Sequence, residues 1–283
     1  MKFAFCFNVE DHLYDSFGGR KLYNSIKYFY PNAIVDWYDS KETNRIQTTY
    51  PWSNRLSFMP CIMKDCMERN RVDRVIKIDA DSLVLSSLDE SFDYYFDICG
   101  VRNDGDHIGN KDESINRPFL IKNIENHKYL SCGFISTNNK DFLNEWIDYN
   151  YYLTQKYGKI ENARTECPMV EQGSYNILFH SGKYKTKILD PLGGNLFYGA
   201  SANMPSPNKH DIPEHIIKEW GVSNWQSWKD IKYINDKFWL YEKQCKLLHF
   251  AGGGSQKTAI KLSFDMFDPS IVPILQKITK CDK

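Results

Sequence analysis

The chain has 283 residues, of which 42% are hydrophobic and 25% are charged, a balance typical of a globular protein with a real core. It carries 36 basic and 36 acidic side chains, so the composition does not indicate a nucleic-acid-binding protein, which needs a basic excess or stripe. No stretch approaches the ~18 consecutive apolar residues of a membrane-spanning helix.

Strands and helices alternate in the first part of the chain. Apolar runs rich in aromatic and branched residues predict the strands, and apolar residues at helical spacing predict the helices. We expect strands in residues 2–9, 33–40 and 73–85, a helix that carries Leu22, Ile26 and Phe29 and is closed by Pro31, and a helix within residues 52–70 that begins or breaks near Pro60. This alternation predicts an α/β fold with a parallel sheet and crossover helices.

The second part of the chain has a looser order of elements. We expect strands in residues 96–101, 130–137 and 185–191, helices in residues 141–158 and 170–182, a long polar loop in residues 102–128, and a linker or surface loop in residues 201–215. Four tryptophans then crowd residues 220–239, and three glycines follow residues 247–251.

The N-terminal residues and the cysteines bear on the cellular compartment. The first apolar run is too short for a secretory signal, so we interpret it as a strand and expect a soluble, cytoplasmic protein. The eight cysteines are scattered and form no C-x-x-C pair. This spacing predicts free thiols in a reducing compartment, with neither a disulfide framework nor a zinc site.

The predicted strand that includes VIKIDADSLVL, residues 75–85, carries two aspartates near its end. Ligands of open parallel sheets gather at the carboxyl ends of the strands, and residues i and i+2 of a strand lie on the same side. Asp79 and Asp81 can therefore point at one place, with Ala80 leaving the space between them open. Two adjacent carboxylates favour a hard divalent cation. The alternative is that one aspartate caps the next turn and the other is solvated.

A histidine and three glycines form a second candidate element, LLHFAGGG. Glycine allows the backbone to approach a bound group closely and to present its N–H groups to phosphate oxygens. His249 beside Gly252 therefore indicates a metal ligand next to a phosphate-binding loop, and Lys257 lies just beyond it. The alternatives are a histidine in the core followed by a flexible turn, and a lysine on the surface.

Glu171 and Gln172, in VEQGSYN, form a third candidate element. A carboxylate beside an amide at a helix start can cap the helix or bind sugar hydroxyls. Spacing alone does not decide between these two roles.

The blocks DADSLVL, LSCGF, EQGSYN and LLHFAGGG, in this order, resemble the nucleotide-sugar glycosyltransferases of the GT-A fold. The resemblance is greatest to the retaining family that includes glycogenin and bacterial lipopolysaccharide galactosyl- and glucosyltransferases. It spans residues 3–257 and implies a mostly parallel, Rossmann-like central sheet flanked by helices. It also implies transfer of a hexose from a UDP-sugar with retention of configuration, and binding of Mn²⁺ (or Mg²⁺) by Asp79, Asp81 and His249.

The same resemblance implies roles for other residues. Glu171 and Gln172 stand where the family has an aspartate–glutamine pair and are the candidate catalytic residues. The implied contacts to the nucleotide-sugar donor are Asn8, Asp11, Tyr14, Arg55, Asp79, Ala80, Asp81, Ser131, Cys132, Gly133, Gly252 and Lys257.

The domain prediction follows from these positions. We expect residues 1–200 to form the catalytic core and residues 201–283 to form a small helical and aromatic extension that returns His249 to the site, within a single domain overall. The tryptophans of this extension either stack on the sugars of a glycan, lipid or protein acceptor or pack as a core. The loop in residues 102–128 either covers the donor or lies on the surface.

Two other functions stay open at this point. A sugar-phosphate nucleotidyltransferase uses a similar sheet and metal aspartates, and residues 17–21, FGGRK, faintly resemble its glycine-rich basic loop. A catalytically silent glycan-binding module is the other alternative; the intact metal residues argue against it, since a binding protein need not keep a diphosphate site.

Overall fold

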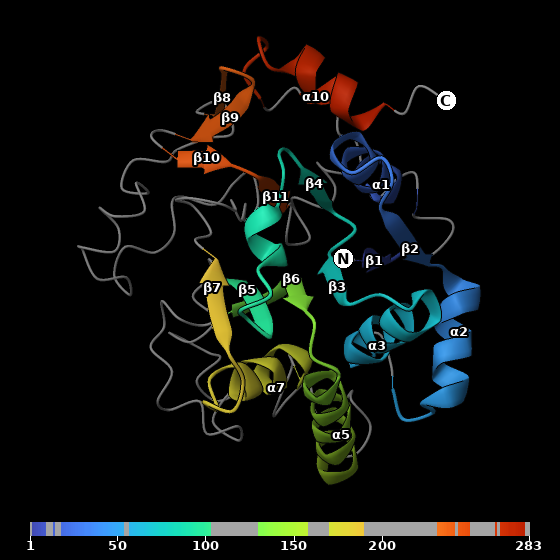
Figure 1. Cartoon of the computed structure of the whole chain (residues 1–283). Helices are drawn as coiled ribbons and strands as arrows, with labels where there is room; N and C mark the ends of the chain where they lie inside the picture. The colour runs from blue at the N-terminus through green and yellow to red at the C-terminus, as the bar shows by residue number, and fades with distance from the viewer. Residues whose placement is uncertain are drawn as a thin grey trace.

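A six-stranded mixed sheet forms the centre of the protein in the computed structural model (Figure 1). The structure describes residues 2–9, 14, 18–53, 57–102, 130–157, 170–189, 231–240, 243–249, 264 and 267–280. The strands of the central sheet, in chain order, are β1 (Phe3–Asn8), β2 (Ile34–Tyr38), β3 (Arg74–Ile78), β5 (Ile98–Arg102), β6 (Leu130–Thr137) and β7 (Thr186–Leu189).

The sheet is mostly parallel, as the sequence predicts. Its spatial order is β2-β1-β3-β6-β5-β7. The β1–β2, β1–β3 and β5–β7 pairs are parallel, and β6 alone among these strands runs antiparallel to both of its neighbours. The fold is therefore α/β, as expected, with one reversed strand in the middle of the sheet.

Helices cover both faces of this sheet. Strand residues alternate between the two sides, so neighbouring residues of one strand are buried in different cores. On β1, Ala4 and Cys6 face the core under one helical layer, whereas Phe5 and Phe7 face the opposite core. The helices are α1 (Gly19–Phe29), α2 (Ser40–Thr49), α3 (Met59–Asn70), α5 (Lys140–Tyr157), α7 (Val170–Phe179) and α10 (Val272–Thr279), besides a short 3₁₀ turn, η2 (Asp89–Phe92). α3, α5 and α7 pack on the first face and α1 on the second.

The predicted strand in residues 73–85 is in fact two strands, and this corrects the sequence interpretation. β3 ends at Ile78, the chain turns through residues 79–81, and β4 (Ser82–Val84) leaves the central sheet. β4 pairs antiparallel with β11 (Leu247–His249) in a separate two-stranded sheet. The aspartates therefore lie in the turn between two sheets.

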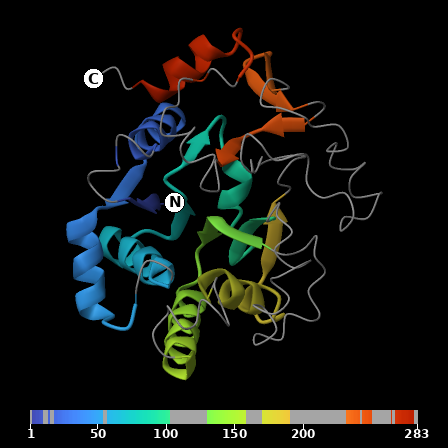
Figure 2. The ribbon, with the colours of Figure 1, turned by 180° about the vertical axis from the view of Figure 1, so that it is seen from behind.

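The chain after residue 230 returns to the core as strands as well as a helix. β8 (Ile231–Ile234), β9 (Lys237–Leu240) and β10 (Lys243–Cys245) form an antiparallel sheet that the sequence did not predict. Ile231, Phe238 and Leu248 share a hydrophobic cluster with Leu83 of β4 and Leu275 of α10. α10 packs against α1, and the reverse view in Figure 2 again shows these two helices side by side.

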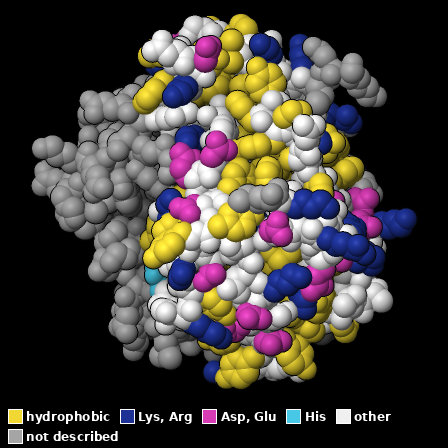
Figure 3. All heavy atoms as spheres, viewed as in Figure 1, with side chains coloured by type: hydrophobic (Ala, Val, Ile, Leu, Met, Phe, Trp, Pro, Cys, Tyr) yellow, Lys and Arg dark blue, Asp and Glu magenta, His cyan; other side chains and the backbone are white. Residues whose placement is uncertain are grey.

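The described surface carries charges of both signs. On the face shown in Figure 3, acidic and basic side chains are interspersed, with no extended patch of one sign. Arg45 and Arg69, for example, share the carboxylates of Glu42 and Asp65. Six of the cysteines lie in the described part of the chain, and all six are buried free thiols. In the same part, no helix is long and apolar enough to span a membrane.

Candidate active site

The turn that follows β3 presents two carboxylates to one place. Asp79 takes its position from the central sheet, because its N–H donates to the carbonyl of Gly133 on β6 at 2.9 Å. About a third of the Asp79 side chain is exposed (34%), whereas Asp81 is nearly buried (8%). The Asp79 side chain is therefore accessible to a ligand from solvent, whereas Asp81 lies deeper in the protein.

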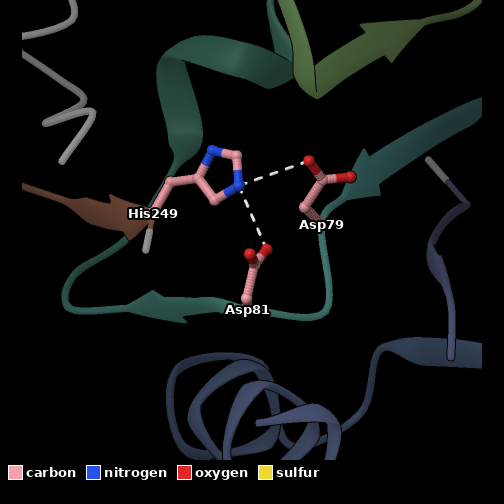
Figure 4. A group of neighbouring side chains, drawn as sticks. All are labelled: Asp79, Asp81 and His249. Carbon is pink, nitrogen blue, oxygen red and sulfur yellow. Dashed lines mark hydrogen bonds and ion pairs between the residues drawn. The ribbon is translucent and has the colours of Figure 1, made fainter. Parts of the chain in front are cut away.

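Pairing of β11 with β4 places His249 beside these aspartates. In this ladder His249 lies opposite Ser82, the residue that follows Asp81. His249 Nε2 lies 3.0 Å from Asp81 Oδ1 and 3.3 Å from Asp79 Oδ2, with the ring pointing at both carboxylates (Figure 4). The imidazole is almost fully buried, with 4% of its side chain exposed. The predicted metal-binding trio is therefore assembled by two strands that lie far apart in the chain.

The geometry of the trio fits a divalent cation. One ligand atom each from Asp79, Asp81 and His249 can be chosen so that all three lie within 4.8 Å of one another. Two carboxylate oxygens and one imidazole nitrogen suit manganese or another first-row cation, and carboxylates alone suit magnesium. Burial lowers the pKa of His249, but the two carboxylates more than offset this, and the net pKa is raised.

Gly18, at the start of α1, packs directly against the turn that holds the aspartates. Its φ angle of +94° is in the left-handed region that favours glycine. A Cβ at this position would lie 3.1 Å from the carbonyl oxygen of Ala80 and 3.7 Å from the Cα of Asp81. The glycine-rich segment noted in the sequence therefore makes room for the aspartate turn.

Sequence reasoning missed Lys77, a lysine buried in the middle of β3 with only 2% of its side chain exposed. Its ammonium group donates to Asp79 Oδ1 and to the backbone carbonyl of Cys132. Burial lowers the pKa of Lys77, but Asp79 and Glu171 raise it further, so the net pKa is raised and the group is charged. The available signal was a lysine two residues before Asp79, which strand alternation places on the same side.

Glu171 and Gln172 reach the same region from the first turn of α7. Burial, together with the charge of Asp79, outweighs Lys77 and raises the pKa of Glu171 to about 7. Gln172 accepts a hydrogen bond from the N–H of Cys132 at 3.1 Å, and its Nε2 is buried with no hydrogen-bond partner. These two side chains and Lys77 therefore form a polar group next to the carboxylates.

The remaining predicted site residues fall into two sets. Ser131, Cys132 and Gly133 lie on β6 beside β3, and the Ser131 hydroxyl accepts the N–H of Gly133 at 2.9 Å. Asn8 ends β1, and the ring of Tyr14 stacks on Trp37 with centroids 3.9 Å apart. Four predicted site residues lie outside the described part of the chain: Asp11, Arg55, Gly252 and Lys257. Residues 103–128 of the predicted polar loop and three of the four tryptophans also lie outside it.

Comparison with known proteins identifies the fold. No family model and no curated protein sequence matches the chain. Among solved structures, the bifunctional glycosyltransferase WbbM matches 92% of this chain, with a TM-score of 0.55 and 14% identity. The galactosyltransferase LgtC, solved with donor and acceptor sugar analogs, matches 98% of this chain, with a TM-score of 0.50 and 11% identity.

The extent of these matches differs between the two structures. The match covers 50% of the WbbM chain and 95% of the LgtC chain. At such low identity, the likeness shows a common fold and leaves the chemistry to the residues of the site.

Proposed function

We propose that this protein is a metal-dependent glycosyltransferase that moves a hexose from a nucleotide-diphosphate sugar, most simply a UDP-sugar, to a glycan, lipid or protein acceptor. The observation that carries the proposal is the convergence of Asp79, Asp81 and His249 at the end of β3, within a fold shared with solved glycosyltransferases. Ligands of open α/β sheets bind at this end of the strands.

The trio would hold Mn²⁺ or Mg²⁺. When bound, such an ion neutralises the negative charge that develops on a departing diphosphate. Asp81 and His249 contribute ligand atoms that are held in place by burial, since both side chains are less than a tenth exposed. Asp79 would contribute Oδ2, because its Oδ1 accepts a hydrogen bond from Lys77.

Glu171 and Gln172 would act on the donor or acceptor sugar. Both lie at the start of α7, and Glu171 is close enough to Asp79 for the two charges to interact. The carboxylate of Glu171 would stabilise positive charge at the anomeric carbon, and Nε2 of Gln172, which has no hydrogen-bond partner, would donate to a sugar oxygen. Retention of configuration and the catalytic roles of these two residues are part of the proposal.

The division of the chain also belongs to the proposal. Residues 1–200 would hold the donor, and residues 201–283 would close the site on its acceptor side while returning His249. The hydrophobic cluster that joins Leu83 and Leu85 of the core to Ile231, Leu248 and Leu275 supports a single structural domain.

A nucleotidyltransferase is the second candidate, but it has no role for the histidine. Figure 4 shows Nε2 of the His249 ring facing both carboxylates, which is the observation that favours transfer from a donor already activated. A glycan-binding module likewise need not keep a site for a diphosphate-bound cation.

Release of nucleotide from a panel of donors tests the proposal. The purified protein is incubated with Mn²⁺ and UDP-, GDP- or CDP-sugars without acceptor, and the released nucleotide is measured. Slow release from one donor, lost in EDTA and in the Asp81→Ala variant, is the expected result. Absence of release from every donor, together with absence of Mn²⁺-dependent nucleotide binding, would overturn the proposal.

A further inference from the structure

Lys77 places a fixed positive charge directly behind one of the candidate metal ligands. It lies on β3 two residues before Asp79, on the side of the sheet that faces α3, α5 and α7, as its neighbour Val75 does. Charged side chains in such a position are rare unless they are paired. Here the ammonium group is paired with Asp79 Oδ1 and with the carbonyl of Cys132.

This contact divides the two oxygens of Asp79 between two cations. Oδ1 accepts from the ammonium group of Lys77, whereas Oδ2 lies 3.3 Å from His249 Nε2, inside the candidate metal trio. Asp79 therefore offers a single oxygen to an ion. It also shares its negative charge with Lys77, so the site attracts a free cation less strongly than two unpaired carboxylates would.

Charge balance then links the ion to the diphosphate. A divalent cation at the trio would be separated from the buried ammonium group of Lys77 only by the carboxylate of Asp79. Two positive charges on either side of one carboxylate repel strongly in a protein interior. A diphosphate adds negative charge on the open side of the ion and offsets that repulsion. If a bound diphosphate strengthens the binding of the cation, the bound cation must strengthen the binding of the diphosphate by the same factor.

We propose that Lys77 is a positioning residue that makes cation binding at Asp79, Asp81 and His249 weak until a nucleotide diphosphate is bound. This inference rests on the proposed donor site and adds a rule for its assembly: the cation and the donor bind together. Replacement of Lys77 by a neutral side chain should therefore tighten the binding of Mn²⁺ alone.

Three variants separate charge from hydrogen bonding. Lys77→Gln keeps donors for Asp79 and Cys132 but removes the charge, Lys77→Met removes both, and Lys77→Arg keeps the charge. The dissociation constant of Mn²⁺ is measured in the absence of nucleotide by titration calorimetry or from the signal of free Mn²⁺ in electron paramagnetic resonance. Thermal unfolding of each variant shows whether it is folded.

The expected result is a Mn²⁺ dissociation constant at least about tenfold lower in Lys77→Gln than in the wild type, since repulsion at this separation exceeds that factor even with strong screening. Lys77→Arg should bind Mn²⁺ as the wild type does. A purely structural role for Lys77 would loosen the site and raise the constant. An unchanged or higher constant in Lys77→Gln, or equal tightening in Lys77→Arg, would overturn the inference.

A second measurement uses the unmodified protein. The affinity for UDP is compared with and without saturating Mn²⁺, and an increase of at least about tenfold is expected from reciprocal coupling. Equal affinities would contradict the inference even if the neutral variants fail to fold. If no nucleoside diphosphate binds at all, the proposed function fails, while the comparison of Mn²⁺ affinity in Lys77→Gln still decides the role of Lys77.

Discussion

His249 Nε2 lies 3.0 Å from Asp81 Oδ1, although 168 residues separate the two in the chain. The β11–β4 ladder brings them together by pairing His249 with Ser82. His249 is thereby fixed by backbone hydrogen bonds to β4, the strand that follows the aspartate turn. The candidate metal trio thus depends on correct pairing of β11 with β4.

The first prediction concerns metal binding by this pair. Asp81→Asn keeps the volume of the side chain but removes a charge and weakens an oxygen ligand. We expect the Mn²⁺ affinity, measured in the presence of UDP, to fall by at least about tenfold. Loss of a partner that only supports a metal ligand already costs about this much, and Asp81 is proposed to be a ligand itself.

Asp236→Asn is the matched control. Asp236 is exposed in the β8–β9 turn with φ +60°, a conformation that asparagine also tolerates. This variant should bind Mn²⁺ as the wild type does. Equal affinity in Asp81→Asn and Asp236→Asn would show that the trio is not the metal site.

Local sequence patterns predicted some of the helices and missed others. The helix carrying Leu22 and Ile26 was predicted because these residues recur at helical spacing, and both are fully buried in α1. α2 was missed because Ile46 is its only buried residue, so it has no apolar periodicity. A capping signal was available there, since Asp39 accepts the N–H of Glu42 at 2.7 Å.

Long-range pairing could not be predicted in the same way. The apolar run through Ser82 looks like a continuation of β3, and only the partner strand decides that it belongs to another sheet. The contact between Lys77 and Asp79 was predictable from strand alternation, whereas the approach of Glu171 depends on how α7 packs. The aspartates were recognisable because unpaired charge at the end of an apolar strand needs an explanation.

Glu171 gives a prediction for pH dependence. Burial raises its pKa to about 7 in the folded protein, above its ordinary value of 4.5. Between these two values the folded state binds more protons than the unfolded state, so the free energy of unfolding falls as pH rises from about 4.5 to 7. In metal-free protein, this one group should reduce the free energy of unfolding by about 2 kcal/mol between pH 5 and pH 7.5.

Glu171→Gln removes this contribution. We expect the variant to gain about 2 kcal/mol relative to the wild type over the same pH interval, measured by urea unfolding in EDTA. Glu90, a partly buried carboxylate paired with Lys246, provides Glu90→Gln as the control. A constant difference between Glu171→Gln and the wild type across the interval would refute a raised pKa of Glu171.

A buried hydrogen-bond network holds the start of α7 against α5. The Ser174 hydroxyl donates to Asn150 Oδ1 at 2.5 Å and accepts from Trp146 Nε1 at 2.9 Å, and Asn150 Nδ2 donates to the carbonyl of Ser57 at 3.1 Å. Ser174→Ala leaves the Asn150 carbonyl oxygen without this donor. We expect a loss of about 1–3 kcal/mol in the free energy of unfolding, measured by urea denaturation.

Thr48→Ala tests a hydroxyl of similar chemistry at an exposed position. Thr48 donates to the carbonyl of Asn44 at 2.9 Å on the surface of α2, and its loss should change the free energy of unfolding by less than about 0.5 kcal/mol. If the two variants were equally stable, the network would not be what holds α7 in place.

Gly18 supplies the last prediction, because two glycines of this chain separate backbone strain from crowding. Gly18 and Gly182 both have positive φ angles, +94° and +76°, so alanine at either position costs about 1–2 kcal/mol of backbone strain. Only at Gly18 would the new Cβ press on the carbonyl oxygen of Ala80, 3.1 Å away, whereas nothing lies within 4 Å of a Cβ built at Gly182.

A displaced turn moves Asp81, and metal sites tolerate only about 0.5 Å of error in the position of a ligand. We therefore expect both variants to lose stability in thermal unfolding, Gly18→Ala more than Gly182→Ala, and only Gly18→Ala to lose Mn²⁺ affinity, by about threefold or more. If Gly18→Ala bound Mn²⁺ like Gly182→Ala, the aspartate turn would not depend on the packing of α1.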